Sequence, residues 1–339
     1  MAEAGDDWAK WAAVKPPNTQ INFWGEEYAE LYDWYPWMRR FYSQIEIDHD
    51  CEPAWLWLRR NSPWLPLIVC AVYMAFCYFG RKIMANRKPF DLKYPLVAWN
   101  FLLCAFSFMG AASRTVPHLI HILYHYGFKY TICYKATVWY GSGAIGLWTQ
   151  AFIFSKIPEL GDTIFIVLRK KPLIFLHWYH HVTVLLYCWH SYYEQTTYGL
   201  YFICMNYSVH AFMYLYYALA ALRIRLCKPY YITTMQISQM FVGLGICMAG
   251  GYHISKGDAK YISVENFQAG VVMYLSYMVL FLQYAFGRFL RRFMSSKDDA
   301  GKKTAAGAGT GAAGAAAARC ARRRKAAPAA AARGQIKVE

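Results

Sequence analysis

LIFLHWYHHVTVLLYCW, residues Leu173–Trp189, is apolar enough to cross a membrane, yet it contains three histidines, His177, His180 and His181. An ionisable side chain at bilayer depth costs about 2.5–3.5 kcal/mol on insertion scales, so such a residue is a candidate for function. Histidine can enter neutral and still take up or release a proton. At about 100° per residue the three side chains share one helix face, which predicts that they converge on one cavity. Hydrogen bonds to neighbouring helices are the alternative reading.

The composition indicates an all-α, polytopic membrane protein. Of the 339 residues 57% are hydrophobic and only 17% are charged, which excludes an ordinary soluble enzyme. We expect about seven transmembrane helices, because seven segments approach the ~20 residues that a bilayer requires. They are Trp64–Gly80, Pro95–Ala112, Trp139–Phe154, Leu173–Trp189, Tyr198–Ala221, Tyr230–Gly250 and Phe267–Phe289.

The distribution of basic residues predicts the orientation. Lysines and arginines follow the first, third, fifth and last predicted spans, whereas the loop Ser191–Thr197 has none and most acids lie in residues 1–62. The positive-inside rule therefore predicts a lumenal N-terminus and a cytosolic C-terminus. The net charge of +16 reflects this bias and the C-terminal tail. It favours anionic lipid headgroups or a polyanionic substrate, and no nucleic-acid-binding module accompanies it.

Three regions are expected along the chain. Residues 1–61 form an N-terminal extension, rich in Trp and Tyr, that is too polar to span and is expected to lie partly on the lumenal surface. Residues 62–293 form one membrane domain. Residues 294–339 turn into Ala/Gly repeats with Arg clusters and no apolar periodicity, which predicts a disordered cytosolic tail.

A polar group, Lys156, Glu159, Asp162 and Thr163, stands at the expected cytosolic end of the third span. The last three residues are spaced i, i+3 and i+4, so they share a helix face. A capped helix with a surface ion pair would produce the same pattern, and the sequence leaves both readings open.

Two further spans carry polar stripes. In the fifth, Asn206, His210, Tyr214 and Tyr217 trace one face. In the sixth, Thr233, Gln236 and Gln239 follow one another at three-residue spacing, and glutamines inside a membrane are costly unless they are hydrogen-bonded. Contacts between helices are the alternative for both stripes.

Depth suggests that these groups form one site. At a rise of 1.5 Å per residue, His180, His210 and Gln239 lie about 13, 18 and 13 Å from the cytosolic ends of three successive spans. Such similar depths predict a shared site.

His118, His121 and His125 share another helix face. A metal site is conceivable there. The favoured reading is an interfacial helix with hydrated histidines on the lumenal side.

The ordered patterns KxxExxDT (Lys156–Thr163), HxxHH (His177–His181), HxxMYxYY (His210–Tyr217) and TxxQxxQ (Thr233–Gln239) resemble the ELO family of very-long-chain fatty acid elongases. The resemblance covers about Trp64–Arg292 and includes neither the extension nor the tail. It implies a seven-helix bundle around an acyl-chain tunnel in the endoplasmic reticulum membrane. The HWYHH form with Pro172 upstream resembles the branch that acts on saturated and monounsaturated chains.

The implied reaction is the condensation of an acyl-CoA with malonyl-CoA to 3-oxoacyl-CoA, CO2 and CoA, with no cofactor beyond the CoA thioesters. The product would pass to a 3-oxoacyl-CoA reductase, a dehydratase and an enoyl-CoA reductase. Lys170, Lys171 and Arg223 are among the cytosolic bases placed to meet CoA phosphates.

Imidazole attacks thioesters readily, so His180 is the expected acyl acceptor. His210 or His181 is expected to assist malonyl decarboxylation. The remaining candidates have supporting roles: Asp162 or Glu159 would orient a histidine, and His177, Lys156, Asn206, Tyr214, Tyr217, Gln236 and Gln239 complete the predicted site. A Cys188 nucleophile and a direct condensation without an acyl-enzyme stay open.

Two rival functions fit the sequence less well. A di-iron desaturase or hydroxylase needs roughly eight histidine ligands in several boxes, and this chain has a single HxxHH. A seven-span receptor or carrier explains the topology but not the aligned polar residues.

Overall fold

The computed structural model describes residues 14, 16 and 18–308, with side chains as far as residue 287. The chain divides into two compact units, Met1–Leu282 and Gln283–Glu339. The first unit contains all the sites discussed below.

Short elements form the N-terminal part of the first unit. A two-stranded antiparallel hairpin pairs β1 (Gln20–Ile21) with β2 (Glu27–Tyr28), and four short helices follow. These are α2 (Leu31–Trp34), the 3₁₀-helix η1 (Pro36–Phe41), α3 (Gln44–Ile47) and α4 (Glu52–Asn61). Helix α3 begins with a capping box, because Ser43 accepts a hydrogen bond from the Glu46 N–H and the Glu46 carboxylate accepts one from the Ser43 N–H.

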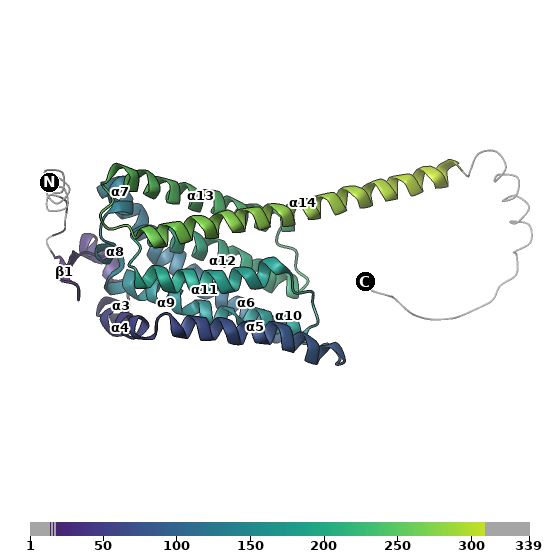
Figure 1. The fold of residues 1–339 in the computed structure, drawn as a ribbon, viewed down its shortest axis with the longest axis horizontal. Helices are drawn as coiled ribbons and strands as arrows, with labels where there is room; N and C mark the ends of the chain where they lie inside the picture. The colour runs from purple at the N-terminus through teal and green to yellow at the C-terminus, as the bar shows by residue number, and fades with distance from the viewer. Residues whose placement is uncertain (1–13, 15, 17, 309–339) are drawn as a thin grey trace, which may run out of the picture. The chain divides into compact units, whose positions relative to one another are not determined.

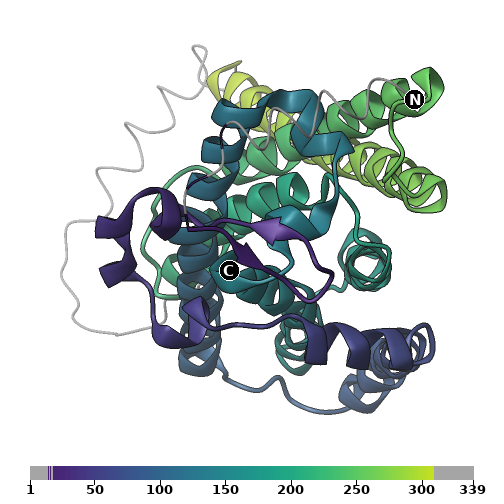
Figure 2. The ribbon, with the colours of Figure 1, turned by 90° about the vertical axis from the view of Figure 1, so that its left-hand side faces the viewer.

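Helices make up the rest of the unit, and several of the long ones run side by side in Figure 1. Figure 2 views the same fold from the end at which the hairpin and the short N-terminal helices lie across the bundle. In chain order the helices are α5 (Trp64–Ala85), α6 (Lys93–Gly110), the π-helix η2 (Ala111–Thr115), α7 (Val116–Cys133), α8 (Ala136–Tyr140), α9 (Gly143–Glu159), α10 (Gly161–Leu168), α11 (Phe175–Tyr193), α12 (Gly199–Ala221), α13 (Pro229–Lys256) and α14 (Val264–Ala308).

The all-α polytopic fold is confirmed, and the predicted spans lie mainly on helices. The exception is Trp139–Phe154, which crosses from α8 into α9 through Gly141 and Ser142. Among the described residues, four helical stretches are long and apolar enough to cross a bilayer: Trp64–Ala85, Lys93–Cys133, Pro229–Lys256 and Val264–Gly287. The predicted count of seven is not established by these four. Polar residues lower the hydropathy of the histidine helix α11, and α9 has only 17 residues, fewer than the ~20 that a bilayer needs.

Close helix packing determines where the polar faces point. A Cβ atom built on Gly243 of α13 would lie only 2.3 Å from the Tyr274 ring of α14, so α13 and α14 approach as they do only because residue 243 lacks a side chain. Gly110 and Tyr207 make a similar contact, with 2.6 Å between the built Cβ and the ring. These contacts bring α14 and α6 against α13 and α12 respectively.

Two of the three histidines of α7 are buried rather than hydrated, contrary to the prediction, whereas His125 is half-buried. His118 and His121 are buried, and the His118 Nδ1 atom lies 3.9 Å from a carboxylate oxygen of Glu30. The Trp34 ring stacks on His125 and meets the His121 ring edge-on. The reason is that the N-terminal segment packs on α7 more closely than its composition indicated. Burial raises the pKa of Glu30 to about 8, which lets this carboxyl enter the interface neutral.

The described structure also differs from the prediction after residue 293. Helix α14 continues to Ala308, so residues 294–308 are helical rather than irregular. Alanine and lysine are strong helix formers, which accounts for the continuation. The rest of the predicted tail, 309–339, lies outside the described residues.

Candidate active site

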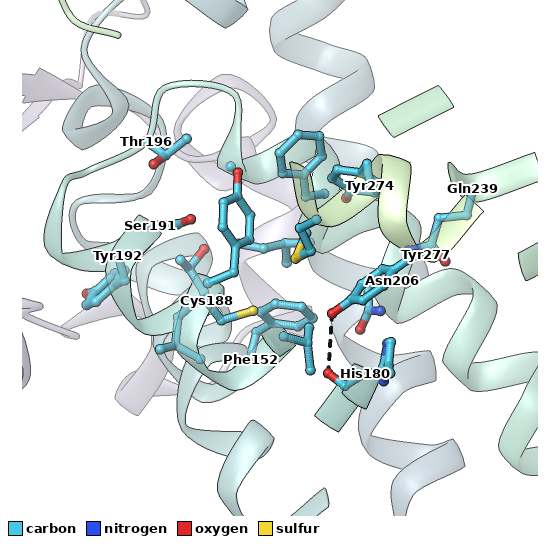
Figure 3. A pocket seen from close by; sticks show the side chains of 18 of the residues that line it. Phe152, His180, Cys188, Ser191, Tyr192, Thr196, Asn206, Gln239, Tyr274 and Tyr277 are labelled. Atoms are coloured by element: carbon cyan, nitrogen blue, oxygen red, sulfur yellow. Dashed lines mark hydrogen bonds between the residues drawn. The ribbon is translucent and has the colours of Figure 1, made fainter. Parts of the chain in front are cut away.

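A cavity of about 60 Å³ lies among α9, α11, α12, α13 and α14. Its wall is predominantly apolar and aromatic, with Phe152, Val184, Phe202, Met240 and Met273 among the lining residues. Figure 3 shows this cavity from close by. Such a long apolar space with few polar groups is typical of a site for an elongated apolar ligand.

One end of the cavity carries the candidate catalytic residues. His180 of α11, Asn206 of α12 and Gln239 of α13 all line it, so the three polar stripes meet where similar depth had predicted (Figure 3). Asn206 and Gln239 are each 8% exposed. Three helices therefore contribute polar side chains to one end of an otherwise apolar space.

A buried ion pair between Lys156 and Glu159 contacts Asn206 at this end of the cavity. The Lys156 Nζ donates to the Glu159 carboxylate over 2.8 Å and to the Asn206 Oδ1 over 3.2 Å. The Asn206 Nδ2 lies 3.2 Å from the His210 Nε2, and the His210 Nδ1 lies 3.9 Å from Glu159. Lys156 is 2% and Glu159 4% exposed, so the alternative of a surface ion pair is wrong. The network links a cation to the amide that lines the cavity.

Asp162 belongs to a different contact. Its carboxylate accepts hydrogen bonds from the Trp99 Nε1 over 2.6 Å and from the Tyr214 hydroxyl over 2.9 Å. The residue thus ties α10 to α6 and α12. Both of these hydrogen-bond donors are aromatic residues and neither is a histidine. Tyr214 is buried against this carboxylate rather than against the cavity.

The three histidines of α11 do not share one cavity, and here the prediction is wrong. His180 lines it, whereas the His177 Nε2 is hydrogen-bonded to Thr163 over 2.9 Å. Thr163 is in turn hydrogen-bonded to the Tyr73 hydroxyl over 2.8 Å, and the His181 ring lies 6.2 Å from the Tyr73 ring. Residues four apart lie above one another on a helix, so 177 and 181 form a pair facing α5 and α10.

The other predicted residues lie farther from the cavity. The Gln236 amide contacts the Met213 sulfur over 3.3 Å, and the Tyr217 side chain is 44% exposed. The Lys170 ammonium donates to the main-chain carbonyls of Ala85 and Arg87. Lys171 and Arg223 are exposed, beyond the ends of α10 and α12 respectively.

Tyr277 of α14 is the site residue that sequence reasoning missed. Its hydroxyl lies 2.6 Å from the Thr183 hydroxyl. It also donates to the His180 main-chain carbonyl over 3.3 Å, the contact that is dashed in Figure 3. Its ring centre is 5.1 Å from that of His180. The sequence feature that could have pointed to it is a tyrosine in the middle of the predicted span Phe267–Phe289, because a buried hydroxyl requires a hydrogen-bond partner.

The possible metal ligands are dispersed. Among the described residues, no group of three or more His, Cys, Asp or Glu side chains is placed to hold a metal ion. The metal site conceived for His118, His121 and His125 is therefore not formed by those side chains in this structure.

Comparison with known proteins identifies the family. The family model described as ELO: GNS1/SUR4 family matches residues 58–297. A "Very long chain fatty acid elongase 6" of Drosophila melanogaster is 46% identical over 240 residues, 69% of this chain and 74% of that protein. The Gallus gallus protein of the same name is 43% identical over 237 residues, 69% of this chain and 87% of the relative. A "Putative fatty acid elongase 3" of Caenorhabditis elegans is 40% identical over 266 residues, 76% and 82% of the two chains. The chain therefore belongs to the ELO (GNS1/SUR4) family, which confirms the fatty acid elongase predicted from its four motifs.

Proposed function

We propose that the internal cavity holds the acyl chain of a fatty acyl-CoA, with the thioester at the end lined by His180, Asn206 and Gln239. The observation that carries the proposal is a mainly apolar cavity lining with His180, Asn206 and Gln239 together at one end. An acyl chain gains from leaving water, whereas its thioester requires polar groups at the reacting carbon. Condensation with malonyl-CoA yields 3-oxoacyl-CoA, CO2 and CoA.

For the first half-reaction, His180 is the proposed nucleophile. Its neutral imidazole attacks the thioester carbon, the carbon–sulfur bond breaks, and CoA leaves as a thiolate that takes up the imidazole proton. The acyl group is then carried on the ring of His180. The Tyr277 hydroxyl contacts the main chain of the same residue and the Thr183 side chain, so it supports the position of the nucleophile.

For the second half-reaction, malonyl-CoA loses CO2 and the resulting carbanion attacks the acyl carbon, which releases His180. Lys156, Asn206 and His210 are proposed to stabilise the charge during this step. The Lys156 ammonium donates to Glu159 and Asn206 and lies 3.9 Å from the centre of the Phe152 ring, which lines the cavity, so its charge is close to the proposed acyl site. His210 contacts Asn206, which lines the cavity, whereas the His181 ring lies beside Tyr73 of α5, which favours His210 as the assisting histidine.

Two alternative chemistries share this site. Cys188 also lines the cavity, two helical turns beyond His180, and its thiol is a possible nucleophile. A direct attack of the carbanion on bound acyl-CoA needs no acyl-enzyme. Trapping the acyl group and locating it by mass spectrometry separates these three routes.

Further proposals concern the setting of the enzyme. We propose a preference for saturated and monounsaturated chains, an endoplasmic reticulum membrane location, and a lumenal N-terminus with a cytosolic C-terminus. Lys171 and Arg223 are exposed beyond helix ends, where they are accessible to the phosphates of CoA. The reaction as written requires no cofactor, and its product requires a reductase, a dehydratase and a second reductase.

The test is an elongation assay with membranes that contain the full chain. Radiolabelled malonyl-CoA is supplied with saturated, monounsaturated and polyunsaturated acyl-CoAs, in parallel with His180→Ala. We expect 3-oxoacyl product from the wild type alone. Equal product from His180→Ala would refute the nucleophile, and no product with any acyl-CoA would refute the function.

A further inference from the structure

The N-terminal segment reaches the closed end of the cavity. We propose that this segment holds that end in place and thereby determines the longest acyl chain that the enzyme accepts. The inference rests on the proposed acyl-binding function of the cavity.

The end opposite His180 is formed by Tyr140, Ser191, Tyr192 and Thr196, which we call the floor. Figure 3 shows Ser191, Tyr192 and Thr196 together, away from His180, Asn206 and Gln239. The Tyr140 hydroxyl donates to the Thr196 main-chain carbonyl over 2.7 Å, which joins α8 to the loop before α12. The floor is thus a hydrogen-bonded layer rather than a loose apolar end.

Gln150 of α9 connects the floor to the N-terminal segment. This buried side chain donates from its Nε2 to the Tyr192 hydroxyl over 2.8 Å and to the Cys51 main-chain carbonyl over 2.9 Å. Its Oε1 lies 2.9 Å from the His49 Nε2. Both polar atoms of one glutamine are therefore used to hold the N-terminal segment to a floor residue.

Cys51 makes a second contact at the same place. The residue is fully buried, and its thiol lies 3.9 Å from the Tyr140 main-chain carbonyl. A Cβ atom built on Gly146 would lie 2.6 Å from the Cys51 sulfur, so α9 admits this side chain only because residue 146 is glycine. The His49 carbonyl also accepts a hydrogen bond from the Gly143 N–H over 3.0 Å. Two floor residues, Tyr140 and Tyr192, are consequently supported from the N-terminal side.

Two of the supporting residues lie outside the family match, which begins at residue 58. His49 and Cys51 precede it, whereas Tyr140, Gln150 and Tyr192 fall within it. The bundle is therefore shared with the family, and the support of its closed end comes from a segment that the family model does not include.

The length of the cavity gives the expected limit. Eleven residues of α11 separate His180 from Ser191, which corresponds to about 17 Å along the helix axis. An extended chain advances about 1.2 Å per bond, so this distance accommodates roughly 14 bonds, or an acyl group of about 14 to 16 carbons. Longer chains must displace the floor.

The experiment compares chain-length profiles of full-length variants in membranes, with saturated acyl-CoAs from 10 to about 22 carbons and labelled malonyl-CoA. His49→Ala and Gln150→Ala loosen the support, and Tyr192→Ala opens the floor directly. Gln44→Ala is the matched control, because Gln44 is an exposed glutamine of the same segment whose side chain donates a hydrogen bond to the neighbouring Asp48 carboxylate. Ratios between acyl-CoAs are measured, because a general loss of folded enzyme lowers all rates equally and leaves these ratios unchanged.

We expect the ratio of 20-carbon to 14-carbon turnover to rise at least threefold in His49→Ala, Gln150→Ala and Tyr192→Ala, and to stay within experimental error in Gln44→Ala. If only Tyr192→Ala shifts the profile, the floor limits the chain but the N-terminal segment does not hold it, and the inference is overturned. Unchanged profiles in all active variants overturn it as well. If Gln150→Ala is inactive, His49→Ala decides, because its side chain is only partly buried. Wild-type membranes that elongate no acyl-CoA would instead refute the proposed function.

Discussion

Replacement of Lys156 by methionine tests whether the buried ion pair stabilises the fold, assists catalysis, or does both. In the wild type the Glu159 carboxylate accepts hydrogen bonds from Lys156 and from the Ser155 hydroxyl, each over 2.8 Å. Methionine fills a similar volume but cannot donate a hydrogen bond, so the Glu159 carboxylate keeps the one from Ser155 and loses the one from Lys156. A buried charge is then left without its counter-charge.

The expected loss of stability follows from burial. Removing one partner of a buried ion pair costs about 3–5 kcal/mol, whereas an exposed pair contributes about 0–1 kcal/mol. The side chains of Lys156 and Glu159 are 2% and 5% exposed. At about 2–4 °C per kcal/mol for a domain of 150–250 residues, the melting temperature is expected to fall by on the order of 10 °C.

The chain contains a matched control. Lys129 and Asp258 form an ion pair with the same nitrogen–oxygen distance of 2.8 Å, but their side chains are 55% and 25% exposed. Lys129→Met should therefore lower the melting temperature by at most a few degrees, because the pair is worth about 1 kcal/mol or less. The double variant Lys156→Met/Glu159→Gln removes both buried charges and should recover most of the lost stability.

The assay measures thermal unfolding in detergent and elongation activity for all four proteins. We expect Lys156→Met to be unstable and inactive, and the double variant to be stable but still inactive, since the cation beside Asn206 is missing. A fall no larger than that of Lys129→Met would refute the argument from burial. Full activity in the double variant would refute the proposed role of Lys156 in the reaction.

Three further predictions concern other parts of the molecule. His180→Ala should lower turnover by at least three orders of magnitude. If Cys188→Ala lowers the elongation rate more than His180→Ala does, the cysteine is favoured as the nucleophile. Tyr277→Phe should lower turnover up to about tenfold, because it removes the hydrogen bond to the His180 carbonyl, worth about 0.5–1.5 kcal/mol, together with the contact to Thr183; an unchanged rate would show that the hydroxyl does not help to position His180. Burial alone would raise the pKa of Glu46, but hydrogen bonds from Arg114 and from the Ser43 N–H lower it to about 2. This stabilisation is present above pH 4.5 and is lost as the pH falls towards 2, so the melting temperature should fall more steeply over that range in the wild type than in Glu46→Gln.

The helices and the chemically important residue types were predictable from local pattern. The apolar runs predicted seven segments that the structure folds as helices, and spacing predicted which side chains share a face. His180, His210 and Gln239 were expected at similar depth from rise per residue alone; His180 and Gln239 line one cavity, and His210 contacts Asn206, which also lines it. These inferences hold because they depend on the geometry of a single helix.

Predictions failed where two elements had to meet. His177 and His181 share a helix face with each other, but Thr163 and Tyr73 come from α10 and α5, and nothing in the periodicity of α11 shows which neighbour lies there. Burial of His118 likewise depends on a segment almost ninety residues earlier in the chain. Local pattern specifies the face of a helix, not its rotation against its neighbours.

The sequence by itself therefore determined a helical membrane protein, its family and the polar residues of a candidate site. Only the tertiary structure decided that His180 alone of the three histidines lines the cavity, that the Tyr277 hydroxyl contacts its main chain, and that Gln150 joins Tyr192 to the N-terminal segment. The physical reason is the packing between helices. Contacts such as the one between Gly243 and Tyr274 set how helices approach and rotate, and they join residues that are distant in the chain.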